Sequence, residues 1–210
     1  MDVVDLESRV RGSILASIAV KELLLAKTEI ASVIADVCEL MIGTFRRGNK
    51  VVFFGNGGSA ADAQHLAAEF VGRFTLVRPA LPALALNANS SSVTAIANDW
   101  GYDSVFSRQI EALAREGDVA FGISTSGQSP NVLQAMSTAR KMALHTVGLT
   151  GASGEQLKDV VDHCICIPSA ETPRIQECHI LVGHIIAELV EHTMFEEHRN
   201  LARPHESIRR

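Results

Sequence analysis

The stretch that most constrains the fold is an apolar run, a glycine turn and a helix start in immediate succession. Residues 51–54 are Val-Val-Phe-Phe, residues 55–58 are Gly-Asn-Gly-Gly, and an alanine-rich segment follows from Ser59. A strand that passes through glycines into a helix gathers backbone N–H groups at the helix end, where the partial positive charge also lies. Ser59 is expected to cap this helix and to add a hydroxyl group. The stretch therefore predicts an anion site.

A second stretch of the same kind lies further along the chain. The apolar run 119–123 leads into residues 124–129, Ser-Thr-Ser-Gly-Gln-Ser, and Pro130 stands at a favoured first position of a helix. Hydroxyl and N–H groups at a helix start suit a phosphate monoester, although a serine-rich turn with one capping hydroxyl would read the same. Neither turn has the Gly-Lys-Ser/Thr of a Walker loop or the third glycine of a dinucleotide fingerprint. We therefore expect a sugar phosphate rather than a nucleotide.

Apolar runs of strand length alternate with helical segments along the rest of the chain. Further strands are expected at 83–86, 146–149 and 163–167, and helices at about 10–46, 93–97, 105–115, from Pro130, after 150–154 and from Glu171 onward. Residues 87–92 and 98–102 are expected to be a polar loop and a turn. This order predicts one α/β domain, a flavodoxin-like three-layer arrangement with a parallel sheet flanked by helices on both faces. Ligands of such sheets bind at the carboxyl ends of the strands, where both turns lie.

The helical segment before the first strand has no strand to pair with. Its apolar residues form one set before residue 26 and a second set, at three- to four-residue spacing, from Ile30 to Phe45. Such a stripe would be an exposed apolar patch unless another subunit covered it. We therefore divide the chain into an N-terminal helical oligomerisation arm (1–50), a continuous core (51–197) and a polar, arginine-rich tail (198–210).

Composition excludes several classes of protein. The formal net charge of −5 argues against broad nucleic-acid binding, and no apolar run reaches the ~20 residues of a membrane span. The acidic N-terminus lacks the features of a signal peptide, so a cytoplasmic location is expected. The four cysteines form no Cys-x-x-Cys pair, and Cys164 and Cys166 have the spacing of one strand face. They are interpreted as reduced, buried thiols.

Two helices carry side chains that could bind a metal ion. His65 and Glu69 stand four residues apart on one helix face, although such a pair is on average only a surface contact. Gln176 and His184, on the last predicted helix, can share a broad face because eight residues are two turns plus about 80°. Imidazole and carboxylate suit Zn²⁺ or a similar divalent ion, whereas a glutamine ligand is unusual. His179 is an alternative ligand that spacing does not exclude.

Taken together, these motifs resemble the phosphoheptose isomerases, which consist of one sugar-isomerase (SIS) domain with an added N-terminal helical arm. The resemblance rests on 55–59, on 65–69 (His-Leu-Ala-Ala-Glu), on Asn98-Asp99, on 124–129 and on 174–179 with His184. It extends from about residue 10 to 197. The sequence departs from the family at Gln128, where asparagine is more usual, and after about residue 200, where the chain continues past the usual end.

The resemblance implies an activity and a set of site residues. Family members interconvert sedoheptulose 7-phosphate and D-glycero-D-manno-heptose 7-phosphate, the first step toward activated heptose for bacterial surface polysaccharides, and are homotetramers with active sites at subunit interfaces. It implies one Zn²⁺ per subunit at His65, Glu69, Gln176 and His184. It implies phosphate contacts from Ser59, Ser124, Thr125, Ser126 and Ser129. It implies further substrate contacts from Asn56, Gly57, Gly58, Glu69, Asn98, Asp99 and Gln176.

The reaction moves a proton between C1 and C2 through an enediol(ate), and it needs a base, a proton donor and stabilisation of the oxyanion. We assign the base to Glu69 and proton transfer at the oxygens to His184. One carboxylate is not both a tight metal ligand and a free base at one moment, so Glu69 loosens from the metal or the metal mainly places the substrate. Two alternatives are a non-catalytic SIS tetramer that binds the replication initiator DnaA and an SIS isomerase of another sugar phosphate. The initiator-associating family typically lacks the carboxylate of Glu69 and the imidazole of His184.

Overall fold

The computed structural model describes residues 3–201, and its centre is a five-stranded parallel sheet. The strands are β1 (Val51–Gly55), β2 (Ala83–Ala85), β3 (Val119–Ser124), β4 (His145–Thr150) and β5 (His163–Cys166). Their order across the sheet is β2-β1-β3-β4-β5. The predicted parallel sheet is confirmed, and each strand ends within a residue or two of its expected limit.

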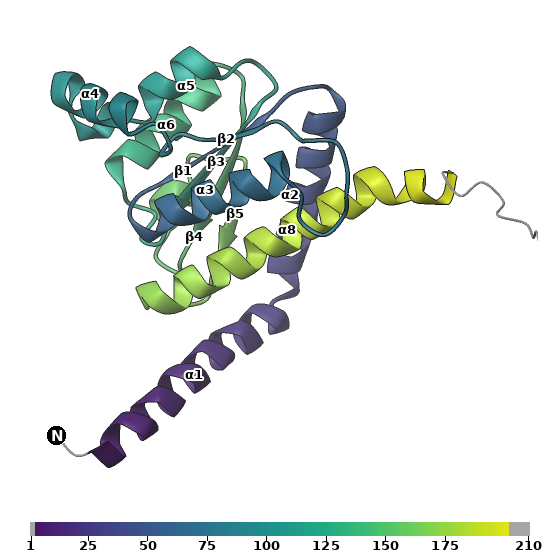
Figure 1. Ribbon diagram of the computed structural model, residues 1–210. Helices are drawn as coiled ribbons and strands as arrows, with labels where there is room; N and C mark the ends of the chain where they lie inside the picture. Colours follow the sequence, from purple (N-terminus) through teal and green to yellow (C-terminus); the bar gives the residue numbers. More distant parts are fainter. Residues whose placement is uncertain (1–2, 202–210) are drawn as a thin grey trace, which may run out of the picture.

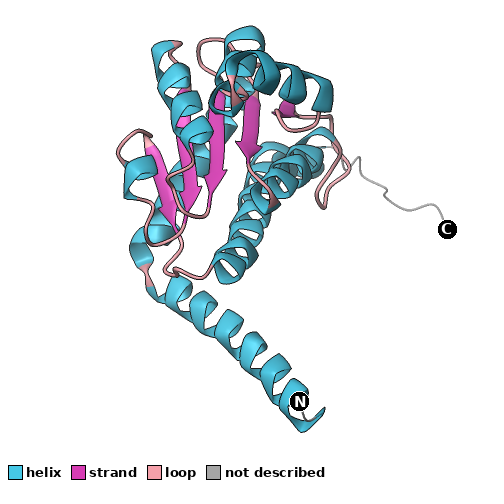
Figure 2. Cartoon of the chain, turned by 90° about the vertical axis from the view of Figure 1, so that its left-hand side faces the viewer, coloured by secondary structure: helices cyan, strands magenta, loops and turns pink. Residues whose placement is uncertain are grey.

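Helices cover both faces of the sheet, which gives three layers (Figures 1 and 2). One face carries α2 (Thr28–Arg46), α3 (Gly58–Val71) and α8 (Thr172–Leu201), and the other carries α4 (Ser90–Trp100), α5 (Ser107–Leu113), α6 (Pro130–Lys141) and α7 (Glu155–Lys158). Successive side chains of a strand point to opposite faces of the sheet, so each face has its own hydrophobic core. Phe53 packs in the core under α2, α3 and α8, and Phe54 packs in the core on the other face. The predicted three-layer α/β fold is therefore confirmed.

Both predicted turns lie at the point where the chain reverses its winding. β1 and β3 are neighbours with Gly55 opposite Ile123, yet the chain leaves β1 into α3 on one face and β3 into α6 on the other. In open α/β sheets this switch point leaves a crevice outside the carboxyl ends of the strands. The fold thus places the 55–58 turn beside the 124–129 turn.

The N-terminal helical segment is two helices rather than the single stretch expected from about 10 to 46. Helix α1 (Val3–Ala26) starts earlier, and Lys27 is extended, with φ −93° and ψ 92°. The break lets α2 lie on the sheet with its apolar side buried, while α1 projects from the body of the domain (Figures 1 and 2). Arg174 of α8 donates a hydrogen bond to the Ser13 carbonyl and holds α1 at that point.

The segment between β2 and β3 differs most from expectation. Residues 87–92 and 98–102 are not simply a loop and a turn, because α4 includes Ser90 and reaches Trp100. The helix starts early because the Asn89 side chain accepts a hydrogen bond from the Ser92 N–H at 3.0 Å, an N-cap that spacing did not reveal. The helix expected at 105–115 is the shorter α5, preceded by a 3₁₀ turn, Tyr102–Ser104.

Two further expectations concern the edges of the sheet. The strand expected at 83–86 lies at the edge of the sheet, with Leu84 39% exposed. Helix α8 continues past His198 to Leu201, and the rest of the predicted tail lies outside the described residues. Among the residues from 3 to 201, no helix combines the length and the apolar character that a membrane span requires.

Candidate active site

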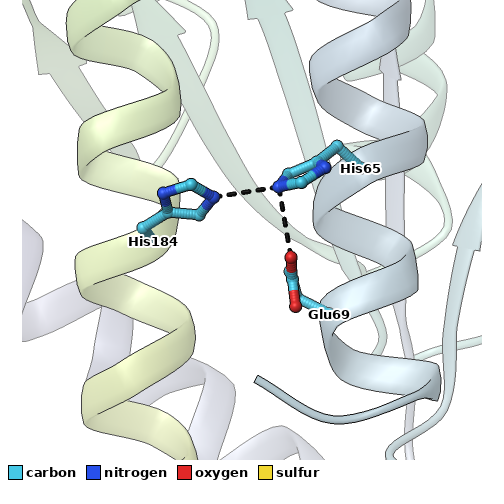
Figure 3. A group of neighbouring side chains, drawn as sticks. All are labelled: His65, Glu69 and His184. Carbon is cyan, nitrogen blue, oxygen red and sulfur yellow. Dashed lines mark hydrogen bonds and ion pairs between the residues drawn. The ribbon is translucent and has the colours of Figure 1, made fainter. Parts of the chain in front are cut away.

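Three side chains from two helices converge on one point at the surface of the domain. His65 and Glu69 come from α3 and His184 from α8 (Figure 3). The His65 Nε2 atom lies 2.9 Å from Nε2 of His184 and 3.1 Å from Oε1 of Glu69. We call these three residues the triad. The structure thus brings together residues that are 119 positions apart in the sequence.

The contact between α3 and α8 depends on a glycine that the sequence analysis did not single out. Gly183 directly precedes His184, and a Cβ atom there would collide with the side chain of Leu66, the neighbour of His65. Leu66 is 2% exposed and has little room to move. A glycine at this position lets the two helix backbones approach until the imidazoles meet. The available signal was a lone glycine within an amphipathic helix. Glycine lowers helix stability, so its presence there indicates a packing requirement.

The triad has the composition and spacing of a metal site. Two ligands at about 2.05 Å from a tetrahedral Zn²⁺ ion are about 3.3 Å apart, close to the two measured separations. The three ligand atoms lie within 4.8 Å of one another. Two imidazoles and a carboxylate form a ligand set that zinc enzymes use, with a position left for water or substrate. The triad therefore fits a divalent ion of the zinc type.

The predicted ligands Gln176 and His179 lie apart from this convergence. The amide of Gln176 packs against Gly58, where a Cβ atom would collide with it, and Gly58 is seven residues, or about 10 Å along α3, before His65. His179 is completely buried, and burial lowers its pKa to about 4, so the ring is neutral at pH 7. Its place in the core separates it from the triad.

A buried ion pair holds the loop beside the triad. Glu191 of α8 accepts hydrogen bonds from the backbone N–H groups of Phe74, Thr75 and Leu76 and from Nε of Arg78. Those hydrogen bonds outweigh burial and lower the pKa of Glu191 to about 2.

The same ion pair reaches two members of the triad. The Phe74 ring lies 5.5 Å from the His184 ring, and Nη2 of Arg78 donates to the Glu69 carbonyl at 2.8 Å. This network, which no sequence pattern indicated, fixes the surroundings of both residues.

A second acid lies beside His65. Asp62 stands three residues earlier on α3, and its Oδ2 atom is buried without a hydrogen-bond partner among the described residues. Burial raises the pKa of Asp62 to about 6, and the nearby His65 opposes this rise. The carboxyl group is therefore partly protonated near pH 6.

The first turn is organised around Asn56 rather than around a serine cap. The expectation that Ser59 caps α3 is wrong, because the helix begins at Gly58 and its N-cap is Gly57, with φ 55°. Ser59 is buried in the first turn of α3. The side chain of Asn56 exchanges two 2.9 Å hydrogen bonds with Asn131 of α6 and accepts a third from the Tyr102 hydroxyl at 3.1 Å. These bonds tie the turn after β1 to the helix after β3.

The second turn presents its hydroxyl groups at the end of β3. The Ser124 and Ser129 hydroxyls are 3.0 Å apart, and Ser124 Oγ accepts the Gly127 N–H at 3.2 Å. Ser126 is exposed and Thr125 half-buried. Four hydroxyl groups thus lie between the end of β3 and the start of α6, and Ser124 is the buried one.

Asn98 and Asp99 lie at the exposed end of α4. The Asn98 amide donates to the Asp99 carboxylate at 2.8 Å, and the described contacts link neither residue to the triad or to the two turns. A hollow of about 520 Å³ near Trp100 and Arg108 contains none of the predicted site residues. The single chain therefore brings the two turns together and assembles the triad, but leaves Asn98 and Asp99 apart.

Known proteins share this fold and much of this sequence. The SIS domain family matches residues 18–151. The chain is 57% identical over 167 residues to the phosphoheptose isomerase of Roseiflexus sp. (strain RS-1), which covers 80% of this chain and 85% of that protein. It is 50% identical over 186 residues to the phosphoheptose isomerase of Aneurinibacillus thermoaerophilus, with 89% and 94% covered. The solved phosphoheptose isomerase of Neisseria gonorrhoeae superposes with a TM-score of 0.83 at 39% identity, over 89% of this chain and 98% of that one.

Proposed function

The chain belongs to the phosphoheptose isomerase family of SIS-domain proteins, and we propose from this premise that it interconverts sedoheptulose 7-phosphate and D-glycero-D-manno-heptose 7-phosphate. It is an aldose–ketose isomerase. The observation that carries the proposal is the convergence of His65, Glu69 and His184 on one point. The alternative of a non-catalytic SIS protein is not favoured, because both groups needed for proton transfer are present and meet.

The length of the substrate agrees with the layout of the site. The triad lies about 10 Å along α3 from the helix start at Gly58. In an extended chain three single bonds span about 3.5 Å, so the eight bonds from C1 of a heptose 7-phosphate to phosphorus span about 9 Å. A heptose phosphate with its phosphate at the start of α3 would thus extend to about the level of the triad.

The ion we propose for the triad is Zn²⁺, held by His65, Glu69 and His184 and completed by Gln176 once its amide leaves Gly58. A bound divalent ion supplies polarisation of the substrate carbonyl. The fit of two imidazoles and a carboxylate to tetrahedral spacing supports this assignment.

Proton transfer is the task of the chain's own residues. We assign to Glu69 the transfer between C1 and C2, through the carboxylate oxygen that does not face His65. His184 holds and moves the proton at the carbonyl and hydroxyl oxygens, from the opposite helix. A positioned base and acid each contribute about 10²–10⁴ to such a rate.

Substrate contacts are proposed for the residues around the crevice. The phosphate would be bound by Ser59, Ser124, Thr125, Ser126 and Ser129, and the sugar by Asn56, Gly57, Gly58, Glu69, Asn98, Asp99 and Gln176. The backbone N–H groups at the starts of α3 and α6 favour an anion at the same place. Within the described part of the single chain, Asn98 and Asp99 contact neither the triad nor the two turns. Their proposed contacts with the sugar therefore depend on another subunit packing beside the site.

We propose that the enzyme is a cytoplasmic homotetramer that performs the first step toward activated heptose for surface polysaccharides. The support for self-association is α1, whose residues Val10, Ile14 and Leu15 are 56–64% exposed. An uncovered apolar helix of this kind is typical of a subunit contact.

One experiment tests the proposed reaction. The purified protein is incubated with sedoheptulose 7-phosphate and, separately, with five- and six-carbon ketose phosphates, and aldose formation is followed with and without a chelator. Turnover of the heptose alone, lost in Glu69→Gln and His184→Gln variants that are loaded with metal, is the expected result. No turnover of any sugar phosphate by the metal-loaded wild type contradicts the proposal, and turnover only of a shorter sugar identifies an isomerase of another substrate.

A further inference from the structure

We infer that Cys164 and Cys166 form a redox-active dithiol that a hydroperoxide oxidises to an intramolecular disulfide, a modification site separate from the isomerase site. Their sulfur atoms lie 3.7 Å apart, and both side chains are half-buried. The interpretation of this pair as buried thiols is therefore wrong, because β5 is the edge strand of the sheet.

Strand geometry brings the two sulfur atoms to one side. Residues two apart in a strand point to the same face, opposite to the face where Ile165 is buried in the core. Their Cα atoms are about 6.6 Å apart at 3.3 Å per residue, within the 4.4–6.8 Å range that disulfides span. The separation is near the upper end of that range and the sulfur atoms must approach from 3.7 Å to bonding distance, so closure requires a local bend of β5, which is an edge strand.

The charges around the pair favour a thiolate at Cys166. The neighbouring Cys164 thiol, together with the positive charges of Lys158 and Lys27, lowers the pKa of Cys166 to about 7 against the opposing effect of burial. The thiolate is the nucleophile in cysteine oxidation, and sensor cysteines have a low pKa and a resolving cysteine nearby. Cys166 is therefore the attacking residue and Cys164 the resolving one.

The other two cysteines make a contrast within the same chain. Cys38 and Cys178 are buried, and burial raises the pKa of both thiols, that of Cys38 to about 11. In the part of the chain that the structure describes, the triad is the only cluster of three metal-binding side chains, so the cysteine pair has no third ligand beside it. A dithiol, rather than a further metal cluster, is what the geometry supports.

The oxidation proceeds in two balanced steps. The Cys166 thiolate attacks the peroxide, so that an S–O bond forms, the O–O bond breaks and hydroxide leaves, which oxidises Cys166 to a sulfenic acid. The Cys164 sulfur then attacks the Cys166 sulfur, the S–S bond forms and the S–O bond breaks. The departing hydroxide takes the Cys164 proton and leaves as water, and the hydroperoxide is the two-electron acceptor.

Peptide mapping tests the inference directly. Trypsin cleaves after Lys158 and Arg174, so both cysteines lie on peptide 159–174, whereas Cys38 lies on peptide 28–46. Reduced protein is treated with a small excess of hydrogen peroxide at pH 7, blocked with N-ethylmaleimide and digested. We expect peptide 159–174 from oxidised protein to carry no maleimide and to be two hydrogens lighter than the reduced, unlabelled peptide. After treatment with dithiothreitol it should accept two maleimide labels, while Cys38 is labelled in every sample.

Single variants identify the attacking residue. The positive charges of Lys158 and Lys27 remain beside Cys166 when Cys164 is replaced by serine, so its thiolate is still favoured. Trapping with dimedone is therefore expected to be faster at Cys166 in Cys164→Ser than at Cys164 in Cys166→Ser, with Cys38→Ser as the matched control that oxidises like the wild type. Full labelling of peptide 159–174 after peroxide treatment, or independent oxidation of its two sulfurs without a disulfide, would overturn the inference. None of these readouts involves isomerase turnover.

Discussion

The charge of the buried Glu191 carboxylate is expected to contribute strongly to stability. The side chain is 0% exposed and receives hydrogen bonds from three backbone N–H groups and from Arg78. These partners lower its pKa from an ordinary 4.5 to about 2. A difference of about 2.5 units corresponds to about 3 kcal/mol. Glu191→Gln should therefore lower the free energy of unfolding at pH 7 by about 3 kcal/mol, because the amide N–H groups face the backbone N–H donors and the buried Arg78 guanidinium loses its carboxylate partner.

The pH dependence gives the prediction its sign. A carboxylate whose folded pKa is lowered stabilises the fold above its unfolded pKa of about 4.5, and this contribution disappears as the pH falls toward about 2. The gap between wild type and Glu191→Gln should thus be constant from pH 7 to about 5 and should shrink between pH 5 and pH 3. A loss of packing alone would give the same gap at every pH.

The assay is urea unfolding followed by circular dichroism at pH 7, 5 and 3, at one protein concentration because self-association alters apparent stability. Glu177→Gln is the matched control, since Glu177 lies on the same helix and pairs with Arg174 but is 37% exposed. Pairs of that exposure contribute about 0–1 kcal/mol. A change below 1 kcal/mol in Glu191→Gln at pH 7, or a gap that does not depend on pH, would refute the reasoning.

Three other substitutions test separate parts of the site. His65→Ala should reduce zinc affinity by at least about 100-fold, measured by competition with a chelator, while circular dichroism stays that of the wild type. Gly183→Ala should push Leu66 aside, lower the free energy of unfolding by about 1–3 kcal/mol and weaken zinc binding; unchanged zinc affinity would show that helix spacing does not control the triad. Ser129→Ala should raise KM about 10–100-fold with a smaller effect on kcat, because one lost hydrogen bond to a charged phosphate costs about 1.5–3 kcal/mol in binding. An unchanged KM would place the phosphate elsewhere.

The sheet and its two turns at 55–58 and 124–129 were predictable from the sequence because their signals are local. Apolar runs that end in Gly55 or Ser124 identify strands, and the parallel order then brings their carboxyl ends to one edge. The predicted helix boundaries were wrong at two places. Asn89 starts α4 early, and Lys27 separates an exposed helix from a packed one.

The triad was predictable only in part because its parts lie on two helices that meet through packing. Spacing indicated His65 with Glu69, but the approach of His184 depends on Gly183 lying against Leu66. The Glu191 network was beyond prediction, since its donors are backbone N–H groups of a loop that carry no residue-specific signal. Such long-range contacts follow from the three-dimensional fold and not from periodicity.

Exchange of the substrate's C1 proton tests the central assignment, that Glu69 moves the carbon-bound proton. Metal-loaded wild type and Glu69→Gln are incubated with sedoheptulose 7-phosphate in D₂O, deuterium at C1 is followed by NMR, and the metal content of each sample is measured. The account predicts exchange in the wild type and exchange at least about 100-fold slower in Glu69→Gln, with the metal still bound. Exchange at the wild-type rate in a metal-loaded Glu69→Gln enzyme would contradict it.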